Sequence, residues 1–316
     1  MKSKIQFPIL MMFLLTIVWS ACTTGGASHT GNGDKIQLEV SVEPGLVYKQ
    51  VSKTVQTSEQ KMMGMSTKTS QVTEMFIKNE VLSVDADGVA DVRATYERIR
   101  SETDNSLTGK TKFDTDTAPE EVPLENRRHM AMIGRSINFK LDKHGTVVDV
   151  SGVDSLFDAI FASIDAGEGD MGMETMKKTL KMTFGDEGIK SMMQSASIQY
   201  PDVLIAEGDT WGKEIGSMAN VPIGIDVTYT VDHIDAEKVV LKFDGKITTD
   251  KSKAMDLGII QMEMDLKGDY SGTTEIDRKT GLVLKSDIDQ DMKGSMGVMG
   301  MNVPMSINQN ITVERY

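Results

Sequence analysis

Apolar and polar residues alternate along much of this chain, which is the pattern of β-strands with one buried face. Between positions 260 and 266, Ile260, Met262, Met264 and Leu266 alternate with polar residues. The same alternation recurs in other runs, at residues 36–42, 72–77, 89–99, 137–141, 147–150, 239–243 and 307–313. The pattern predicts a sheet with many strands.

Short polar turns separate several of these runs. Asp87-Gly88, His144-Gly145 and Thr280-Gly281 each stand between two alternating segments. Dipeptides that end in glycine accept the left-handed backbone of a tight β-turn. We therefore expect these three positions to close antiparallel hairpins.

The middle of the chain has a different period. After Asp154, which is a candidate helix cap, apolar residues recur at helical spacing: Leu156, Phe157, Ile160, Phe161 and Ile164. A second helix is predicted over residues 173–184. A third follows Gly185, with one apolar stripe formed by Ile189, Met192, Met193 and Ala196.

These elements predict an α+β fold that is mostly β. We expect one long, curved, half-barrel-like antiparallel sheet with two or three helices inserted in the middle of the chain. The predicted domain covers residues 35–316, with a first β half (35–150), a helical insert (151–198) and a second β half (199–316).

The two β halves contain similar hairpin sequences in the same order. Residues 85–89 and 140–150 in the first half correspond to 235–239 and 275–285 in the second. Two interpretations stay open: an internal duplication, or hairpins that converged on the same turn chemistry.

The first 21 residues have the order of an export signal. Lys2 and Lys4 precede an apolar run from Ile9 to Trp19, and small residues follow. About 11 apolar residues are too few to span a bilayer of about 30 Å as a permanent helix. We expect the segment to be removed after export.

Cys22, the single cysteine of the chain, follows Ala21 directly. A cysteine after two small residues resembles the lipobox of bacterial lipoproteins, which implies cleavage between Ala21 and Cys22 and acylation of the thiol, for example with palmitate. Trp19 stands where that motif usually has leucine, so an ordinary signal with an incidental thiol is the alternative. Residues 23–34 are rich in Gly, Ser, Thr and Asn and read as a flexible tether.

The export signal, Cys22 and the tether together predict a lipid-anchored protein of the outer membrane. The residues after Cys22 lack an acidic cluster of the kind that resembles a surface-export signal, so we expect the periplasmic face. Two or more acyl chains anchor a protein stably.

Charge and cysteine content narrow the function classes. The chain has 34 Lys and Arg against 47 Asp and Glu, a net charge of −13, and removal of the signal takes away two of the lysines. An acidic protein is a poor ligand for nucleic acid, whose phosphates attract Lys and Arg. With one cysteine, no disulfide within the chain is possible, so stability has to come from an apolar core.

Candidate catalytic chemistry is sparse. The four histidines are His29, His129, His144 and His233, and none has zinc-ligand spacing or a neighbouring nucleophile motif. We predict no metal site, no cofactor and no catalytic residue. A glycan-active enzyme that uses two of the many carboxylates is the alternative.

The 24 methionines are unusually many. Flexible thioethers fill irregular apolar space, either in a core or against a variable apolar ligand. Met262, Met264, Met299 and Met301 are the candidate ligand-lining or core residues. Met296, Met299, Met301 and Met305 also lie close together in sequence, which makes Cu(I) binding a weaker alternative.

The segment "IQYPDVLIAEGDTWGKEI", residues 198–215, resembles a recurrent feature of a family of uncharacterised Bacteroidota lipoproteins with a domain of unknown function. The "GLVYKQ", "GTVVDVSGVDSLF" and "DRKTGLV" segments agree with it. The resemblance implies an exported, anchored β-rich domain and no known activity. Within it, Trp211 is expected to plug the edge of the core, with stacking on a sugar as the alternative.

A looser architectural similarity is to periplasmic lipoprotein carriers, in which helices lie against a curved sheet. The leading hypothesis is therefore a non-enzymatic protein that binds a lipid or another apolar molecule. The alternative is a structural or assembly protein that binds another envelope protein.

Overall fold

The structure is a computed structural model that describes residues 35–62, 64–164, 171–216, 222–250, 254–256, 261–298 and 300–316. Its strands are β1 (Val47–Met62), β2 (Met65–Val84), β3 (Ala90–Asn105), β4 (Gly109–Asp114), β5 (Ser136–Leu141), β6 (Val147–Ser151), β7 (Thr210–Ile215), β8 (Ile223–Ile234), β9 (Lys238–Thr249), β10 (Ala254–Asp256), β11 (Gln261–Asp277), β12 (Val283–Val298) and β13 (Met301–Arg315). The helices are α1 (Arg127–Met132), α2 (Val153–Ile164), α3 (Met171–Phe184) and α4 (Asp186–Ala196).

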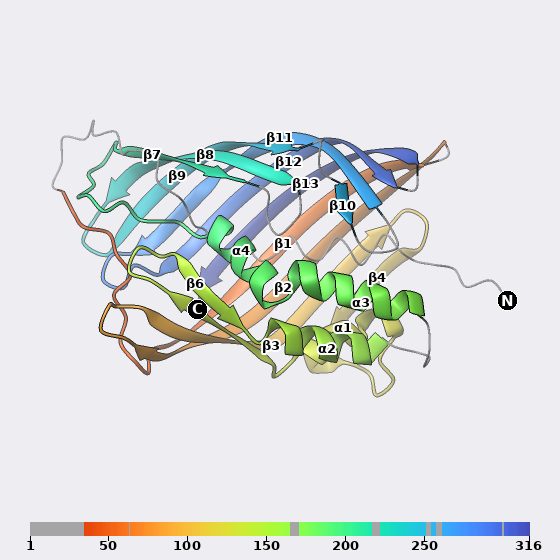
Figure 1. The fold of residues 1–316 in the computed structure, drawn as a ribbon, viewed down its shortest axis with the longest axis horizontal. Coiled ribbons are helices and arrows are strands. Elements are labelled where there is room, and N and C mark those ends of the chain that lie inside the picture. The colour runs from red at the N-terminus through yellow and green to blue at the C-terminus, as the bar shows by residue number, and fades with distance from the viewer. Residues whose placement is uncertain are drawn as a thin grey trace.

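All strands join one antiparallel sheet of 13 strands, in the order β6-β5-β3-β2-β1-β13-β12-β11-β9-β8-β7. β4 pairs with β3 and β10 pairs with β11 beside this path. The first and last strands of the chain therefore lie side by side in the middle of the sheet, where β1 pairs with β13 over 11 residues. Figure 1 shows the sheet as a curved layer with α2, α3 and α4 on one side of it.

The predicted fold class is confirmed: a mostly β chain, one long open antiparallel sheet, and helices inserted in the middle of the chain. The duplication remains one of two interpretations.

The three predicted hairpin turns are present. Gly88, Gly145 and Gly281 all have positive φ, at 81°, 78° and 66°. An aspartate three or four residues before each glycine organises the turn through its side chain. For example, Asp277 Oδ1 accepts hydrogen bonds from the backbone N–H of Lys279 and Thr280.

Residues 36–42 do not form a strand of the sheet, contrary to the prediction. Ile36 makes an isolated bridge to Ile205, while Val40 N–H donates to the Lys143 carbonyl at 2.7 Å. Ile36, Leu38 and Val40 are nevertheless buried. The alternation correctly indicated which side chains are buried, but it did not indicate whether the segment pairs with another strand.

The cap of α2 also differs from the prediction. Asp154 is the second residue of the helix, and the carboxylate at its N-terminus belongs to Asp186, the first residue of α4. Asp186 Oδ1 accepts from Val153 N–H at 2.7 Å. A side chain 33 residues away therefore satisfies a backbone donor that the sequence assigned to a local cap.

One continuous core lies between the sheet and the helices. It includes Val147 and Val150 of β6 together with Ile189 and Met193 of α4, and it extends along the same sheet face to β8 and β9. We call this the inner face. The opposite, outer face carries charged pairs such as Lys238 with Glu275, 2.8 Å apart.

Candidate functional site

Polar side chains, most of them buried, occupy the inner face at the centre of the sheet, where a core would normally be apolar. They come from β1, β2, β12 and β13. We call them the polar band: Gln50, Ser52, Thr54, Gln56, Ser58, Gln71, Thr73, Asn79, Gln290 and Gln309. Gln71 and Gln290 are half-buried, and the others are buried.

Strand β1 contributes to the band because its Gln, Ser and Thr residues, and not its valines, face the core. Gln50, Thr54 and Gln56 face the core and are 5%, 3% and 6% exposed. Val47 and Val55 face outward and are 48% and 40% exposed. The outward face also carries Lys49, Lys53 and Glu59, so a shift of one residue in register would bury charges in place of the polar residues. The pairing with β2 and β13 holds the polar residues inside.

Four glutamines form a row across the band. Gln290 pairs with Gln309, Gln309 with Gln56, and Gln56 with Gln71. Directly opposite residues in antiparallel strands have Cβ atoms roughly 5 Å apart, so the amides lie side by side over four strands. Next to this row, Thr54 pairs with Thr73.

Several polar atoms of the band are buried without a hydrogen-bond partner among the described residues. They are Ser52 Oγ, Thr54 Oγ1, both side-chain atoms of the Asn79 amide, and Gln309 Nε2. An unpartnered buried polar group costs about 1–3 kcal/mol, and native structures contain few of them. A cluster on three neighbouring strands indicates a place where a ligand or ordered water supplies the missing partners.

Another polar pair on the same face is satisfied within the protein. The hydroxyls of Thr274 on β11 and Ser286 on β12 lie 2.8 Å apart and are buried. The sheet geometry therefore permits hydroxyl pairing across strands. The unpartnered atoms of the polar band are a local property of β1, β2 and β13.

Arg315 places a positive charge at one end of the band. It pairs with Gln50, and its guanidinium lies 5.1 Å from the centre of the Tyr48 ring. Its Nη1 is buried and has no hydrogen-bond partner among the described residues. At the inner-face positions described for β1, β2, β3, β11, β12 and β13, Arg315 is the single charged residue.

Two tyrosines near this end are neutral. Burial raises the pKa of Tyr48, and the positive charge of Arg315 offsets part of that rise. Burial raises the pKa of Tyr96 to about 12. Both hydroxyls therefore keep their protons at neutral pH, and neither neutralises Arg315 as a phenolate.

Apolar residues flank the polar band on the β11 side. Met262 and Met264 are buried in the core, 5% and 7% exposed, together with Leu266. Met301 begins β13 and is 40% exposed, so it is not a core residue, and Met299 lies outside the described residues. Met296 and Met305 are half-buried against the core. The inner face thus combines a methionine-lined flank with a polar centre.

The other residues singled out in the sequence lie apart from the polar band. Ala21, Cys22 and His29 fall outside the described residues. His233 is half exposed beside Glu207, with Nδ1 2.7 Å from Oε1. Trp211 is 3% exposed and stacks on Tyr229 with ring centres 5.7 Å apart, so it is buried in the core and is not presented to a sugar.

His129 is a buried imidazole outside the polar band. It lies on α1 and stacks on Phe113 of β4, with ring centres 6.0 Å apart. Burial, helped by the neighbouring Arg128 charge, lowers its pKa to about 4. His129 is neutral under physiological conditions.

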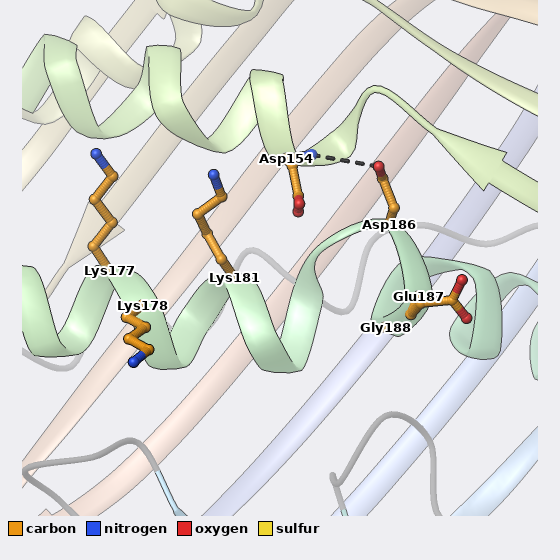
Figure 2. A pocket seen from close by; sticks show the side chains of 7 residues that line it. All are labelled: Asp154, Lys177, Lys178, Lys181, Asp186, Glu187 and Gly188. Carbon is orange, nitrogen blue, oxygen red and sulfur yellow. Dashed lines mark hydrogen bonds between the residues drawn. The ribbon is translucent and has the colours of Figure 1, made fainter.

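An open cleft of about 610 Å³ lies between the helices, as Figure 2 shows. Its lining residues are Asp154, Lys177, Lys178, Lys181, Asp186, Glu187 and Gly188. Lys177 and Lys181 point toward α2, where both bind Asp158, at 3.4 and 2.9 Å. The hydrogen bond from Lys181 is the main cause of the lowered pKa of Asp158. Lys177 and Lys181 connect α3 to α2, so their charges are paired with Asp158 within the protein.

Within the described ranges, no group of three or more His, Cys, Asp or Glu side chains is arranged to hold a metal ion. In the same part of the chain, no helix is both long and apolar enough to cross a membrane.

Residues 87–283 match the family model described as "Family of unknown function (DUF6263)". The chain belongs to this family. The match runs through parts of both β halves and the helical insert, and it leaves out β1, β2, β13 and all of β12 except its first residue. No curated protein matches the chain.

Among solved structures, the chain is similar to one titled "Lipid-protein interactions in lipovitellin", at 8% identity and a TM-score of 0.47. That match covers 87% of this chain and 25% of the lipovitellin chain, so the protein spans about a quarter of that relative. An outer membrane channel from Pseudomonas putida F1 is similar over 90% of this chain and 100% of its own, at 8% identity and a TM-score of 0.25. Similarity at this level carries no argument about function.

Sequence reasoning missed the polar band. It depends on β1, β2, β12 and β13, and neither β1 nor β12 stood out as an alternating apolar strand. One signal was available: in "VSKTVQTSEQ" (residues 51–60), every second residue is Ser, Thr or Gln, and the residues between them are Val, Lys, Thr and Glu. What the sequence did not give is which of those two faces is buried.

Proposed function

We propose that this protein is a non-enzymatic, lipid-anchored envelope protein whose inner face binds an amphipathic apolar molecule. The observation that carries the proposal is the cluster of unpartnered polar atoms on Ser52, Thr54 and Gln309, buried at the centre of the sheet. A ligand with a polar part would supply the missing hydrogen bonds. Its apolar part would lie against the methionine-lined flank.

The band itself carries uncharged groups, namely hydroxyls and amides. Such groups recognise esters, amides and hydroxyls without demanding a counter-ion. Met264 and the partly buried Met296, which pair across β11 and β12, offer adaptable apolar surface. Together these features favour an amphipathic lipid over a sugar or a peptide.

The anchor is the second part of the proposal. Export, cleavage before Cys22 and acylation of its thiol would attach the protein to a membrane, and the residues after Cys22 favour the periplasmic face of the outer membrane. The resemblance to Bacteroidota lipoproteins supports this address. Growth with a labelled palmitate analogue should label the wild-type chain and leave Cys22→Ser unlabelled. Equal labelling of both would refute the anchor.

Ligand binding is tested on the full chain carrying Cys22→Ser, exported to a periplasm, purified without detergent and examined by native mass spectrometry with lipid extraction. We expect a co-purifying lipid, or uptake of one from a mixed lipid extract.

A matched pair of variants locates the binding site. Thr54→Val removes an inward hydroxyl, and Thr57→Val removes an outward one from the same strand. Lipid should be lost from the first variant and kept by the second. A protein that stays empty in all forms refutes the lipid proposal and favours an envelope-protein partner, which crosslinking in intact cells would then identify.

A further inference from the structure

We infer that the molecule bound on the inner face is an amphipathic anion, with an apolar chain that ends in an oxyanion held by Arg315 and Asn79. The inference rests on the proposed function and adds to it the charge of the ligand and the place of its head group. It follows from where the unpartnered donors of the inner face lie.

The donors gather at one end of the polar band. Asn79 is fully buried, and both polar atoms of its amide have no hydrogen-bond partner in the part of the chain that the structure describes. It pairs with Tyr48, whose ring is covered by the Arg315 guanidinium. Arg315 pairs in turn with Gln50, the next inward residue of β1. Adjacent strands are about 4.8 Å apart, so Asn79 on β2 and Arg315 on β13 stand roughly 10 Å apart across the sheet, on either side of β1. A head group that lies over Tyr48 would be between them.

The charge balance of this end favours an anion. Arg315 is the single charged residue at the described inner-face positions of the six central strands, and its Nη1 is buried without a hydrogen-bond partner among the described residues. The residue as a whole is half-buried. A carboxylate or phosphate would accept two guanidinium N–H groups in parallel and so satisfy the buried one. The neutral tyrosines Tyr48 and Tyr96 cannot act as a counter-ion to Arg315.

The inward side chains next to this end define where the ligand chain would run. From Arg315 along β13 come Val313 and Ile311, and beyond the glutamine row comes Ile307. Ser52 and Thr54 lie beside the first two on β1. An acyl chain along this line would pass the unpartnered hydroxyls before it reached the methionine-lined flank. A carboxylate and a phosphate monoester share the chemistry that this end selects.

The test measures binding of oleate, methyl oleate and acetate to the full chain carrying Cys22→Ser, by equilibrium dialysis after delipidation. Oleate and methyl oleate share the chain and differ in charge, whereas acetate has the charge without the chain. We expect oleate to bind at least about tenfold more tightly than methyl oleate, since hydrogen bonds to a charged group are the strong ones. Acetate should show no measurable binding at the same concentrations.

Arg315→Met should abolish the preference for oleate and leave binding of methyl oleate within about twofold. Arg93→Met is the matched control, because Arg93 is exposed on the outer face of β3. It should bind oleate as the wild type does. Circular dichroism of both variants checks that they fold.

The outcomes separate this inference from the proposed function. Equal binding of oleate and methyl oleate would overturn the anionic head group while the lipid site stands. Binding of neither would refute the lipid site itself. Acetate that binds as tightly as oleate would overturn the amphipathic ligand in favour of a small free anion. The comparison of oleate with methyl oleate on unmutated Arg315 decides the question even if Arg315→Met does not fold.

Discussion

Two regions of the same inner face differ sharply in how their side chains are satisfied. Toward one edge of the sheet, Trp211, Tyr229, Phe243 and Tyr270 of β7, β8, β9 and β11 stack in series, with ring centres 5.7, 5.6 and 5.1 Å apart. We call this row the aromatic ladder. At the centre, the polar band has a comparable depth of burial but leaves hydroxyls and amides without partners.

The aromatic ladder behaves as core. Its rings are at most 8% exposed, they fill the space between strands, and Gly272 leaves room for the Phe243 ring. Ring packing accounts for most of the first region, in which Trp211 Nε1 is the one ladder atom buried without a hydrogen-bond partner among the described residues. The polar band has five such atoms on β1, β2 and β13, so hydrogen bonds within the described chain leave it far less satisfied. This difference in unpartnered polar atoms is the reason for placing the candidate site at the polar band.

The largest expected effect concerns the ladder. Phe243→Ala removes a fully buried ring that contacts both Tyr229 and Tyr270, so the free energy of unfolding should fall by about 3–5 kcal/mol. Urea denaturation followed by tryptophan fluorescence measures it. A loss below about 1 kcal/mol would show that the ladder is not core and would remove the contrast with the band.

The polar band is uncharged, so acid sensitivity should come from elsewhere. His129 has a pKa near 4 when folded and near 6.5 when unfolded, because burial disfavours its charged form. Below pH 6.5 the unfolded state takes up the proton first, so stability falls as the pH drops toward 4, by about 3 kcal/mol in total.

The measurement compares urea unfolding of the wild type and His129→Phe at pH 7 and pH 4.5. The variant should lose less stability between these two values, and Thr54→Val should lose as much as the wild type. A wild-type slope in His129→Phe would assign the acid sensitivity to other groups.

A smaller effect tests the packing between Gly272 and the ladder. A Cβ at this position would lie 2.6 Å from Phe243 Cζ and would also overlap the Asp287 carbonyl oxygen. Gly272→Ala should therefore lower the free energy of unfolding by about 1–3 kcal/mol through overpacking. Gly212→Ala on β7 is the control, because its Cβ would meet nothing closer than 3.9 Å. Equal effects from both would argue against tight packing at the ladder.

The smallest effect is expected within the polar band. Thr54→Val replaces an unpartnered hydroxyl by a methyl group of similar size, so the stability of the ligand-free protein should stay unchanged or rise by up to about 1 kcal/mol. Ser286→Ala, which breaks the buried bond to Thr274, should instead cost about 1–2 kcal/mol. A loss of more than about 1 kcal/mol in Thr54→Val would mean that the hydroxyl is already satisfied, and the band would then be ordinary structure.

Much of the fold was predictable because it depends on local signals. Residues 137–141 and 147–150 became β5 and β6 around a glycine with positive φ, and the helical spacing after residue 153 became α2. The prediction of a strand at residues 36–42 was wrong because alternation indicates which side chains are buried and not which strands pair. Strand β1 was not predicted because its inward residues are polar and its outward face mixes valines with Lys and Glu, so neither face reads as apolar.

The sequence by itself determined the β-rich class, the three hairpin turns, the helical insert and the acidic charge, since each follows from a periodicity, a turn residue or a count. The tertiary structure alone decided that β1 pairs with β13 and that its Ser, Thr and Gln residues face inward. A period of two defines two faces without saying which is buried. That choice is made by strands more than 200 residues away in the chain, and it creates the polar band and brings Arg315 to its end.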